Sequence, residues 1–214
     1  PEGYGVITFN PLEKTPEFIH YTIADGLADN SVSAIHEDAK GYIWFGSLQG
    51  VSYYNGTGIS HYTTPELRSD RAVSSICHDH QNHLWLNVSH QCAMYSNPFP
   101  EHTSDSISQI LDADGFFENI INICRDMAGR IWFSSRRNHG IMCLDQDTWT
   151  LYPNSSGVLN NATSIFGDSR GWVWFGGWGD GLSCFDGNRF TRYNSHNGLI
   201  GNGVIDIAED HEGN

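Results

Sequence analysis

A short motif, Asp-x-x-Gly in four copies and Asp-x-x-Asn in one, recurs along this chain of 214 residues at successive spacings of 41, 47, 42 and 42 residues. In four copies a tryptophan stands six residues after the aspartate. The motif residues are Asp38, Asp79, Asp126, Asp168 and Asp210, with Trp44, Trp85, Trp132 and Trp174. An internal repeat of this length means that one small unit of structure is built several times over, and this constrains the fold more than any other feature.

Each unit has the pattern of four short β-strands. Apolar residues alternate before the motif, as at 32–35 and 73–76, which is the period-two pattern of a strand. Asp and Gly at the ends of the motif favour a type I turn, and the strand that carries the Trp follows it. Turn signals such as Asn55-Gly56 then predict a hairpin between a third and a fourth strand. Four antiparallel strands per unit are typical of a β-propeller blade.

We therefore expect a single all-β domain, a β-propeller of four-stranded antiparallel blades whose Trp and Ile side chains fill the spaces between neighbouring sheets. Four full blades are expected at about 26–66, 67–107, 108–155 and 156–197. Half blades are expected at both ends, with third and fourth strands within 1–25 and a first strand with its turn within 198–214. The halves could close a five-blade ring, but about four residues of a second strand would be missing at the joint. We expect instead a fragment of a seven-blade propeller.

The first full unit resembles the two-component regulator propeller repeat. The residues that carry the resemblance are Gly26, Leu27, Asn30, Val32, Ile35, Asp38, Gly41, Ile43, Trp44, Phe45, Gly46, Gly50 and Val51. The resemblance implies the periplasmic sensor region of a hybrid two-component regulator of Bacteroidetes, in which tandem propellers sense oligosaccharides. The resemblance does not imply that this segment is an enzyme. In such regulators the kinase activity resides in other domains. The family has no fixed ligand motif, so no binding residue follows from the resemblance.

The charge of the chain excludes some partners. Eleven Lys and Arg stand against 25 Asp and Glu, for a formal net charge of −14. Such a surface repels phosphate, which argues against nucleic acid and anionic membrane as partners. No run of 18 apolar residues occurs, so we expect no membrane contact by this segment. The acidity also fits the periplasmic location that the resemblance implies.

The cysteines and histidines each have a plain structural interpretation. All five cysteines fall in expected strands, and equivalent positions of neighbouring sheets lie about 10 Å apart, too far for a disulfide. We expect them to be small buried hydrophobic residues. The histidines His78, His80 and His83 surround Asp79 like a metal cluster, with a structural metal site as the alternative. The repeat alignment places them on and around an exposed turn, so we expect no metal and no cofactor.

The candidate ligand-binding residues lie on the links between the second and third strands, where the units differ most. Aromatic faces and planar polar groups of this kind bind sugars. Trp178 stands out because the other units have no aromatic residue there, and Arg136 with Arg137 suggests an anionic sugar. The candidates are Gln49, His90, Arg136, Arg137, Asn138, His139, Trp178 and Asp180.

Three functions remain open at this point. The leading one is a non-enzymatic sensor module that binds an oligosaccharide fragment. The alternatives are a scaffold propeller that mediates protein contacts or homodimerisation, and a propeller lyase or glycosidase, although no hydrolase, P-loop or zinc-protease motif is present. The remaining blades, or another propeller of the same parent chain, are expected partners in each case.

Overall fold

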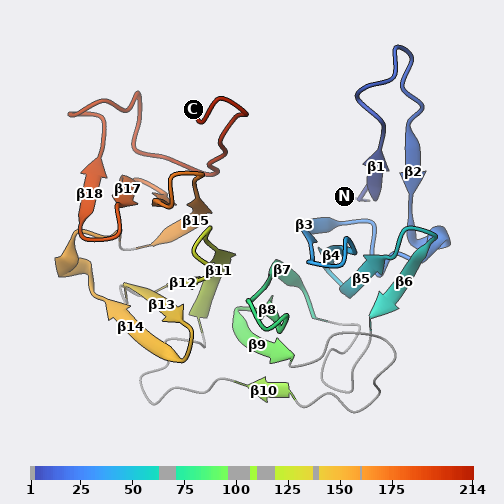
Figure 1. The fold of residues 1–214 in the computed structure, drawn as a ribbon, viewed down its shortest axis with the longest axis horizontal. Coiled ribbons are helices and arrows are strands. Elements are labelled where there is room, and N and C mark those ends of the chain that lie inside the picture. Colours follow the sequence, from blue (N-terminus) through green and yellow to red (C-terminus); the bar gives the residue numbers. More distant parts are fainter. Residues whose placement is uncertain (1–2, 63–70, 96–106, 110–118, 137–139, 160) are drawn as a thin grey trace.

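Four antiparallel sheets of four strands each, and one two-stranded hairpin, follow one another along an arc (Figure 1). The computed structural model describes residues 3–62, 71–95, 107–109, 119–136, 140–159 and 161–214. Each sheet consists of strands consecutive in the chain, so that one repeat forms one sheet. Two short 3-10 turns, η1 (Ile23–Asp25) and η3 (Asn154–Ser156), precede the first and the fourth sheet.

The strands have the following bounds. The hairpin is β1 (Val6–Thr8) and β2 (Ile19–Tyr21), and the first sheet is β3 (Val32–Glu37), β4 (Ile43–Ser47), β5 (Gly50–Tyr54) and β6 (Ile59–Tyr62). The second sheet is β7 (Val73–His78), β8 (Leu84–Val88), β9 (Gln91–Tyr95) and β10 (Ile107–Gln109). The third is β11 (Ile120–Arg125), β12 (Ile131–Ser135), β13 (Ile141–Asp145) and β14 (Thr148–Tyr152), and the fourth is β15 (Ala162–Gly167), β16 (Val173–Gly177), β17 (Gly181–Phe185) and β18 (Phe190–Tyr193).

This architecture confirms the predicted all-β fold of four-stranded antiparallel blades. The described sheets do not close into a ring, as expected for a fragment of a propeller. The hairpin β1–β2 lies at one end of the arc and the C-terminal segment at the other (Figure 1). The boundary expected at residue 107 falls at the start of β10, and a total of seven blades stays a prediction.

The C-terminal segment differs from expectation, because residues 204–207 form no strand. Gly203 makes an isolated bridge with Trp178, and the Val204 amide donates to the Gly177 carbonyl at 3.0 Å. A first strand becomes part of a ladder by pairing with the second strand of its own unit, and the described residues hold no such strand for this unit. The turn at Asp210 forms nevertheless, with the Gly213 amide 3.1 Å from the Asp210 carbonyl.

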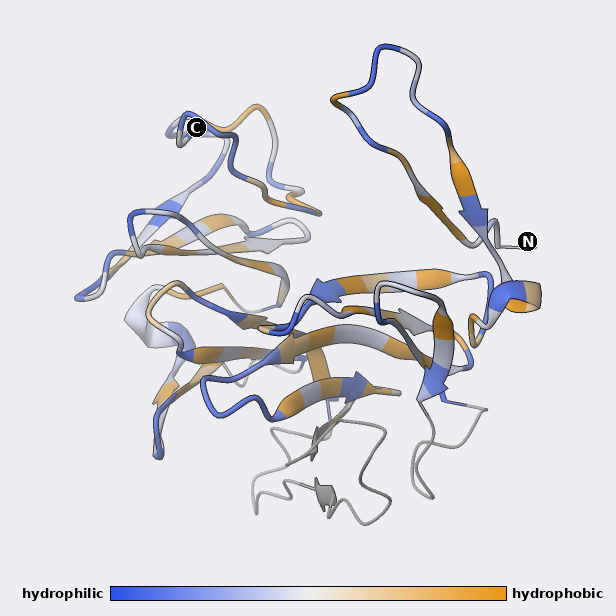
Figure 2. Cartoon of the chain, turned by 45° about the vertical axis from the view of Figure 1, so that its right-hand side comes forward, coloured by the Kyte–Doolittle hydropathy of each residue, from blue (hydrophilic) through white to orange (hydrophobic). Residues whose placement is uncertain are grey.

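The core lies between neighbouring sheets, whose first strands β3, β7, β11 and β15 run next to one another. Figure 2 shows the apolar residues concentrated in the strands and the polar ones in the turns. Trp44, Trp85 and Trp132 are at most 2% exposed and pack against the sheet that follows, as predicted. Trp174 in the last sheet is only half-buried, since no complete sheet follows it in the described part of the chain.

Every first strand also contains an irregularity that the repeat did not predict. The pairing register shifts two residues into the strand in all four sheets, between Val32 and Ala34, Val73 and Ser75, Ile120 and Asn122, and Ala162 and Ser164. A β-bulge of this kind increases the local twist of a strand. Repeating it at the same place gives each sheet the same twist where it meets its neighbour.

The five cysteines behave as small apolar residues. All are free thiols, four of them buried and Cys124 half-buried, as expected. Burial raises the pKa of the Cys124 thiol to about 11, so this group stays protonated and unreactive near neutral pH. Of the helical turns in the described residues, none has the length and apolar character needed to cross a membrane.

Candidate functional site

The repeated aspartates organise one end of every sheet, which we call the turn face: the end with the Asp-x-x-Gly turns and the hairpins between third and fourth strands. In the first unit, the Asp38 Oδ1 atom accepts the amides of Lys40 and Tyr42 at 2.8 and 3.0 Å. Its Oδ2 atom accepts the indole Nε1–H of Trp44 at 3.0 Å. The equivalent indole bonds are Trp85 to Asp79, Trp132 to Asp126 and Trp174 to Asp168, all at 2.8–3.0 Å.

These bonds explain why the aspartate and the tryptophan recur together. The fourth residue of the turn has a left-handed backbone, with φ of 82° at Gly41 and 66° at Asn82, which glycine and asparagine tolerate. Burial raises the pKa of Asp79, but bonds from Trp85 and His83 outweigh this effect and hold the pKa below its usual value. Asp38, Asp79, Asp126 and Asp168 are therefore structural turn caps, and each also anchors the tryptophan of its sheet.

The predicted ligand residues lie at the opposite end of the sheets, which we call the link face: the end with the links between second and third strands. Trp178 is 71% exposed, and Asp180 is 4.0 Å from the Arg192 guanidinium. Gln49 donates to the Asp29 carboxylate at 2.7 Å, and the His90 carbonyl accepts the Ile120 amide. The structure thus brings Trp178 and Asp180 together on one link and places Gln49 and His90 on others.

The three-residue stretch 137–139 lies outside the described residues, and with it the candidates Arg137, Asn138 and His139. Arg136, the residue before it, is exposed, and its amide donates to the Asn119 carbonyl at 2.9 Å. The candidate residues come from all four sheets, and which of them share a ligand stays a prediction.

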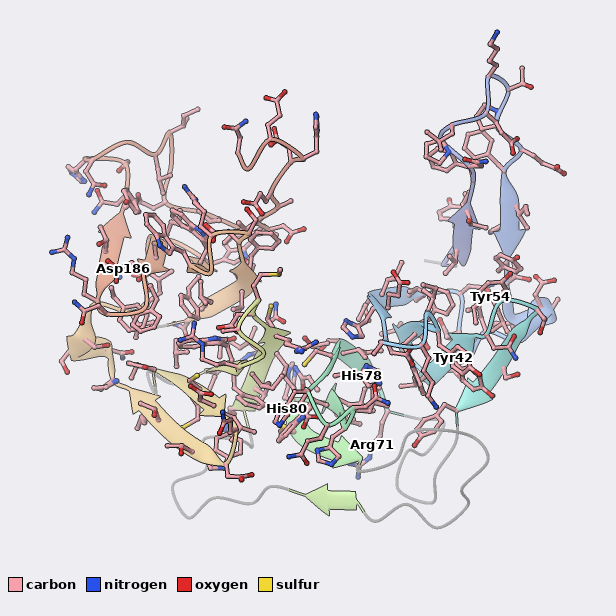
Figure 3. The ribbon with its side chains drawn as sticks, viewed as in Figure 1. Tyr42, Tyr54, Arg71, His78, His80 and Asp186 are labelled. Atoms are coloured by element: carbon pink, nitrogen blue, oxygen red, sulfur yellow. The ribbon has the colours of Figure 1, made fainter. Side chains whose placement is uncertain are left out.

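The structure corrects part of the prediction that the histidines around Asp79 lie on an exposed turn. His83 donates from Nδ1 to the Asp79 Oδ2 atom at 2.8 Å and His80 is exposed, as a turn requires. His78, however, lies among the side chains of the second sheet (Figure 3) and is 3% exposed. Its ring stacks on His36 at 5.1 Å and lies 5.5 Å from the Trp44 ring. Within the described ranges no three His, Cys, Asp or Glu side chains are grouped so that they could hold a metal ion.

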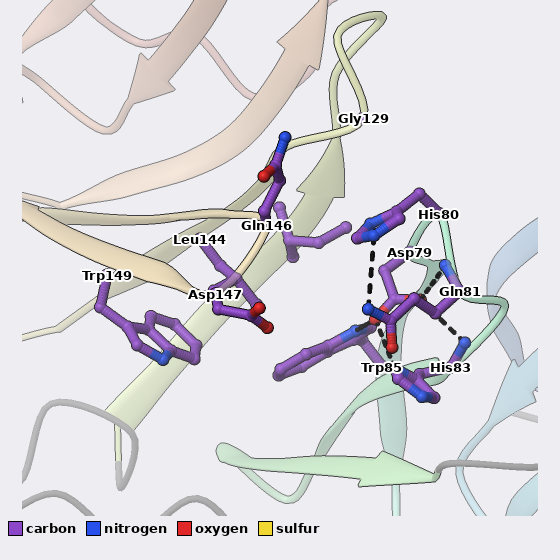
Figure 4. Close-up of a pocket in the computed structure, with 11 residues that line it drawn as sticks. Asp79, His80, Gln81, His83, Trp85, Gly129, Leu144, Gln146, Asp147 and Trp149 are labelled. Atoms are coloured by element: carbon purple, nitrogen blue, oxygen red, sulfur yellow. Dashed lines mark hydrogen bonds and ion pairs between the residues drawn. The ribbon is translucent and has the colours of Figure 1, made fainter.

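A cleft of about 300 Å³ opens on the turn face between the second and third sheets (Figure 4). One wall is the turn between β7 and β8, and the other is the hairpin between β13 and β14. Trp85, Ile131 and Leu144 supply apolar surface between the walls. The remaining lining residues are Asp79, His80, Gln81, His83, Gly129, Gln146, Asp147 and Trp149.

Sequence reasoning assigned binding to the link face and missed this cleft. The signal was nevertheless present in the repeat. The hairpins of the first and fourth sheets have glycine at the second turn position, Gly56 and Gly187, where the third sheet has Gln146 with φ of 53°. Glutamine in place of glycine at this left-handed position departs from the repeat as clearly as Trp178 does on the link face.

Comparison with known proteins identifies part of the chain. Residues 26–49 match the family model described as "Two component regulator propeller". This segment is similar to a two-component regulator propeller repeat. The three sheets after it share the Asp–Trp bond and the bulge seen in the first sheet. None of the curated proteins matches the chain.

Solved structures share the fold at low identity. The extracellular domain of BT3049 from B. thetaiotaomicron, described as a hybrid two component system, aligns with a TM-score of 0.71 at 22% identity, over 87% of this chain and 26% of its own. PorZ, a surface component of the type-IX secretion system of Porphyromonas gingivalis, gives 0.68 at 16%, over 97% and 34%. Virginiamycin B lyase from Staphylococcus aureus gives 0.63 at 15%, over 90% and 69%.

These likenesses establish the propeller fold of the chain. The neighbours described as two-component, secretion or lyase proteins are 14–22% identical to this chain. Similarity at this level establishes nothing beyond the fold. The chain also spans 26% and 34% of the lengths of BT3049 and PorZ, so that most of each of those molecules has no counterpart here.

Proposed function

We propose that this chain is a non-enzymatic part of a periplasmic sensor module of a hybrid two-component regulator, and that it binds an oligosaccharide fragment on its link face. The propeller repeat at 26–49 and the fold shared with the extracellular domain of BT3049 support the sensor role. The remaining blades or another propeller of a parent chain are the partners that this role requires.

The observation that supports ligand binding on the link face is the exposed side chain of Trp178. Its side chain is 71% exposed, while the backbone of the same residue is fixed by the bridge to Gly203. An exposed ring on a rigid backbone can stack on a sugar with little loss of conformational entropy. Asp180 and Arg192, on the neighbouring strand end, offer a carboxylate and a guanidinium for the hydroxyl groups of the sugar.

Replacing Trp178 by alanine should weaken oligosaccharide binding about threefold to tenfold, the effect of one lost aromatic contact. Isothermal titration of the protein with a panel of oligosaccharides, neutral and uronate-containing, measures this. The control is Leu48→Ala, which removes a 56% exposed apolar side chain from the link of another sheet and should leave affinity unchanged. Equal affinities of the Trp178→Ala variant and the parent would remove the residue from the site, and release of cleaved product would overturn the non-enzymatic assignment.

A second candidate function, a scaffold for protein contacts, is favoured by apolar side chains left uncovered near the two ends of the arc. Ile35 in β3 is 64% exposed and Ile205 is 67% exposed, whereas the equivalents of Ile35 in the next three sheets are at most 8% exposed. Uncovered apolar surface of this kind marks interaction sites. Concentration-dependent association in sedimentation experiments, together with no binding from the panel, would favour the scaffold over the ligand sensor.

A further inference from the structure

We propose that the cleft between the second and third sheets is a separate binding site for a single sugar ring that carries no acidic group, with amino sugars preferred. The site lies on the turn face, at the opposite end of the sheets from Trp178, and does not depend on the link-face site. Its volume of about 300 Å³ is at the lower end of the range for small-molecule sites, about 300–1,000 Å³, which fits one ring better than a chain of them.

The aromatic wall of the cleft is Trp149. Its side chain is 40% exposed, although its ring packs on Phe133 at 5.4 Å and meets the Trp85 ring edge to face at 6.2 Å and 71°. These contacts hold the ring in place from behind while part of it stays accessible. An aromatic ring fixed in this way gives a sugar a flat apolar surface without moving.

The same location is filled at the next interface, between the third and fourth sheets. There Arg130 occupies the position of His83, and its guanidinium lies over the rings of Trp132 and Phe185 at 5.2 and 6.0 Å. Leu144 stands where the fourth sheet has Phe185. Both side chains contact the aspartate of their turn, His83 to Asp79 at 2.8 Å and Arg130 to Asp126 at 2.6 Å, but His83 is the smaller and does not extend over the next sheet as Arg130 does. The cleft therefore arises from particular side chains at one interface, since the first and second strands pair in the same register in the second, third and fourth sheets.

The hairpin that forms one wall places polar groups at a conformational cost. Gln146 adopts φ of 53°, a left-handed backbone that the equivalent Gly187 adopts freely with φ of 96°. Strained residues of this kind occur preferentially at binding sites. Gln146 lines the cleft, and across from it Gln81 does so from the other wall (Figure 4). Two amides facing one space can donate to and accept from adjacent hydroxyls of a sugar.

The charge of the lining selects the class of sugar. Asp79 and Asp147 both line the cleft, and the described lining residues include no lysine or arginine. The Asp79 carboxylate is already bonded to Trp85 and His83, whereas no hydrogen bond or ion pair involves the Asp147 side chain within the described ranges. A carboxylate beside an aromatic ring attracts an ammonium group and repels carboxylate or sulfate groups. Amino sugars fit this lining, and uronates and sulfated sugars do not.

Titration of the protein with glucosamine, glucose and glucuronate, followed by calorimetry or by ligand-observed NMR, tests the proposal. We expect glucosamine to bind tightest and glucuronate not at all. Asp147→Asn should remove the preference for glucosamine over glucose, a loss of about tenfold for one charge-assisted bond. Equal binding of glucosamine and glucuronate to the parent protein would overturn the proposal.

Gln146→Gly separates binding from folding. Because glycine relieves the left-handed strain, the variant should keep its Tm or gain about 2–4 °C, while glucosamine binding weakens about tenfold. Unchanged glucosamine affinity of this variant would also overturn the proposal. Leu12→Ala is the matched control, since Leu12 is 92% exposed between β1 and β2, belongs to neither binding site and should leave glucosamine binding unchanged when replaced. Gln146→Gly leaves the link face intact, so oligosaccharide binding there should not change in that variant. The two sites therefore fail or succeed separately.

Discussion

Replacing Trp132 by alanine is expected to lower the free energy of unfolding by about 3–5 kcal/mol, the usual effect of deleting a large buried aromatic side chain. Trp132 is 0% exposed and joins the third sheet to the fourth. Its ring stacks on Tyr152 at 5.6 Å and meets Phe175 at 5.6 Å and 68°, and its indole donates to Asp126 at 2.8 Å. Denaturant unfolding followed by tryptophan fluorescence and circular dichroism measures the loss.

Two further variants divide this effect into packing and hydrogen bonding. Trp132→Phe keeps a ring in the core but removes the indole bond, so a loss of about 1–2 kcal/mol is expected. Trp178→Ala removes an exposed tryptophan and should change stability by less than about 0.5 kcal/mol. If Trp132→Ala were as stable as Trp178→Ala, the interface between the sheets could not be the main source of stability.

Acidification from pH 7 to pH 4 should remove about 3 kcal/mol of stability through His78 alone. Burial, with a smaller contribution from His36 and Arg125, lowers the pKa of His78 from 6.5 to about 4, against the opposing effects of Asp38 and Asp79. The folded protein therefore binds fewer protons than the unfolded chain between these two values. Stability is retained above pH 6.5, falls as the pH drops below 6.5, and the loss through this group is complete below about pH 4.

His78→Phe tests the assignment, because it keeps an aromatic ring against His36 and Trp44 but cannot be protonated. Unfolding free energies measured from pH 7 to pH 4 should fall less in this variant than in the parent. A smaller decline remains, since burial lowers the pKa of His36 as well. The pKa values of Asp79 and Asp168 are lowered in the folded protein, so their contribution to stability is lost mainly at the acidic end of this range and below it. An identical pH profile for variant and parent would contradict the prediction.

The repeat made the fold predictable, because the same pattern of strands and turns recurs in every unit. Alternating apolar residues gave the first strands, and the Asp-x-x-Gly turns formed as expected, with Asn82 replacing glycine at a left-handed position. The constant six-residue spacing from Asp38 to Trp44 was visible too, but the bond between carboxylate and indole was not inferred from it. A spacing shows that two residues depend on each other without showing which atoms meet.

The cleft and the buried His78 were not predicted, and for a shared reason. Both depend on contacts between residues of different units. His78 is covered by His36 of the previous sheet, and the cleft exists because Leu144 and His83 leave space that Phe185 and Arg130 fill one interface further on. Aligning the units compares equivalent positions with each other, whereas these features arise from non-equivalent positions that only the packing of the sheets brings together.

Each described sheet contacts only its immediate neighbours in the arc. This arrangement affects how the amino-acid sequence of such a chain can change. In a stack of this kind, stability is close to a sum of one contribution per sheet and one per interface. Side chains at one interface can then be exchanged without disturbing the rest of the stack. The interface between the second and third sheets carries a strained Gln146 and an open cleft, while the next one keeps its packed aromatic cluster. In a repetitive fold, each interface between sheets can thus acquire a binding specificity of its own.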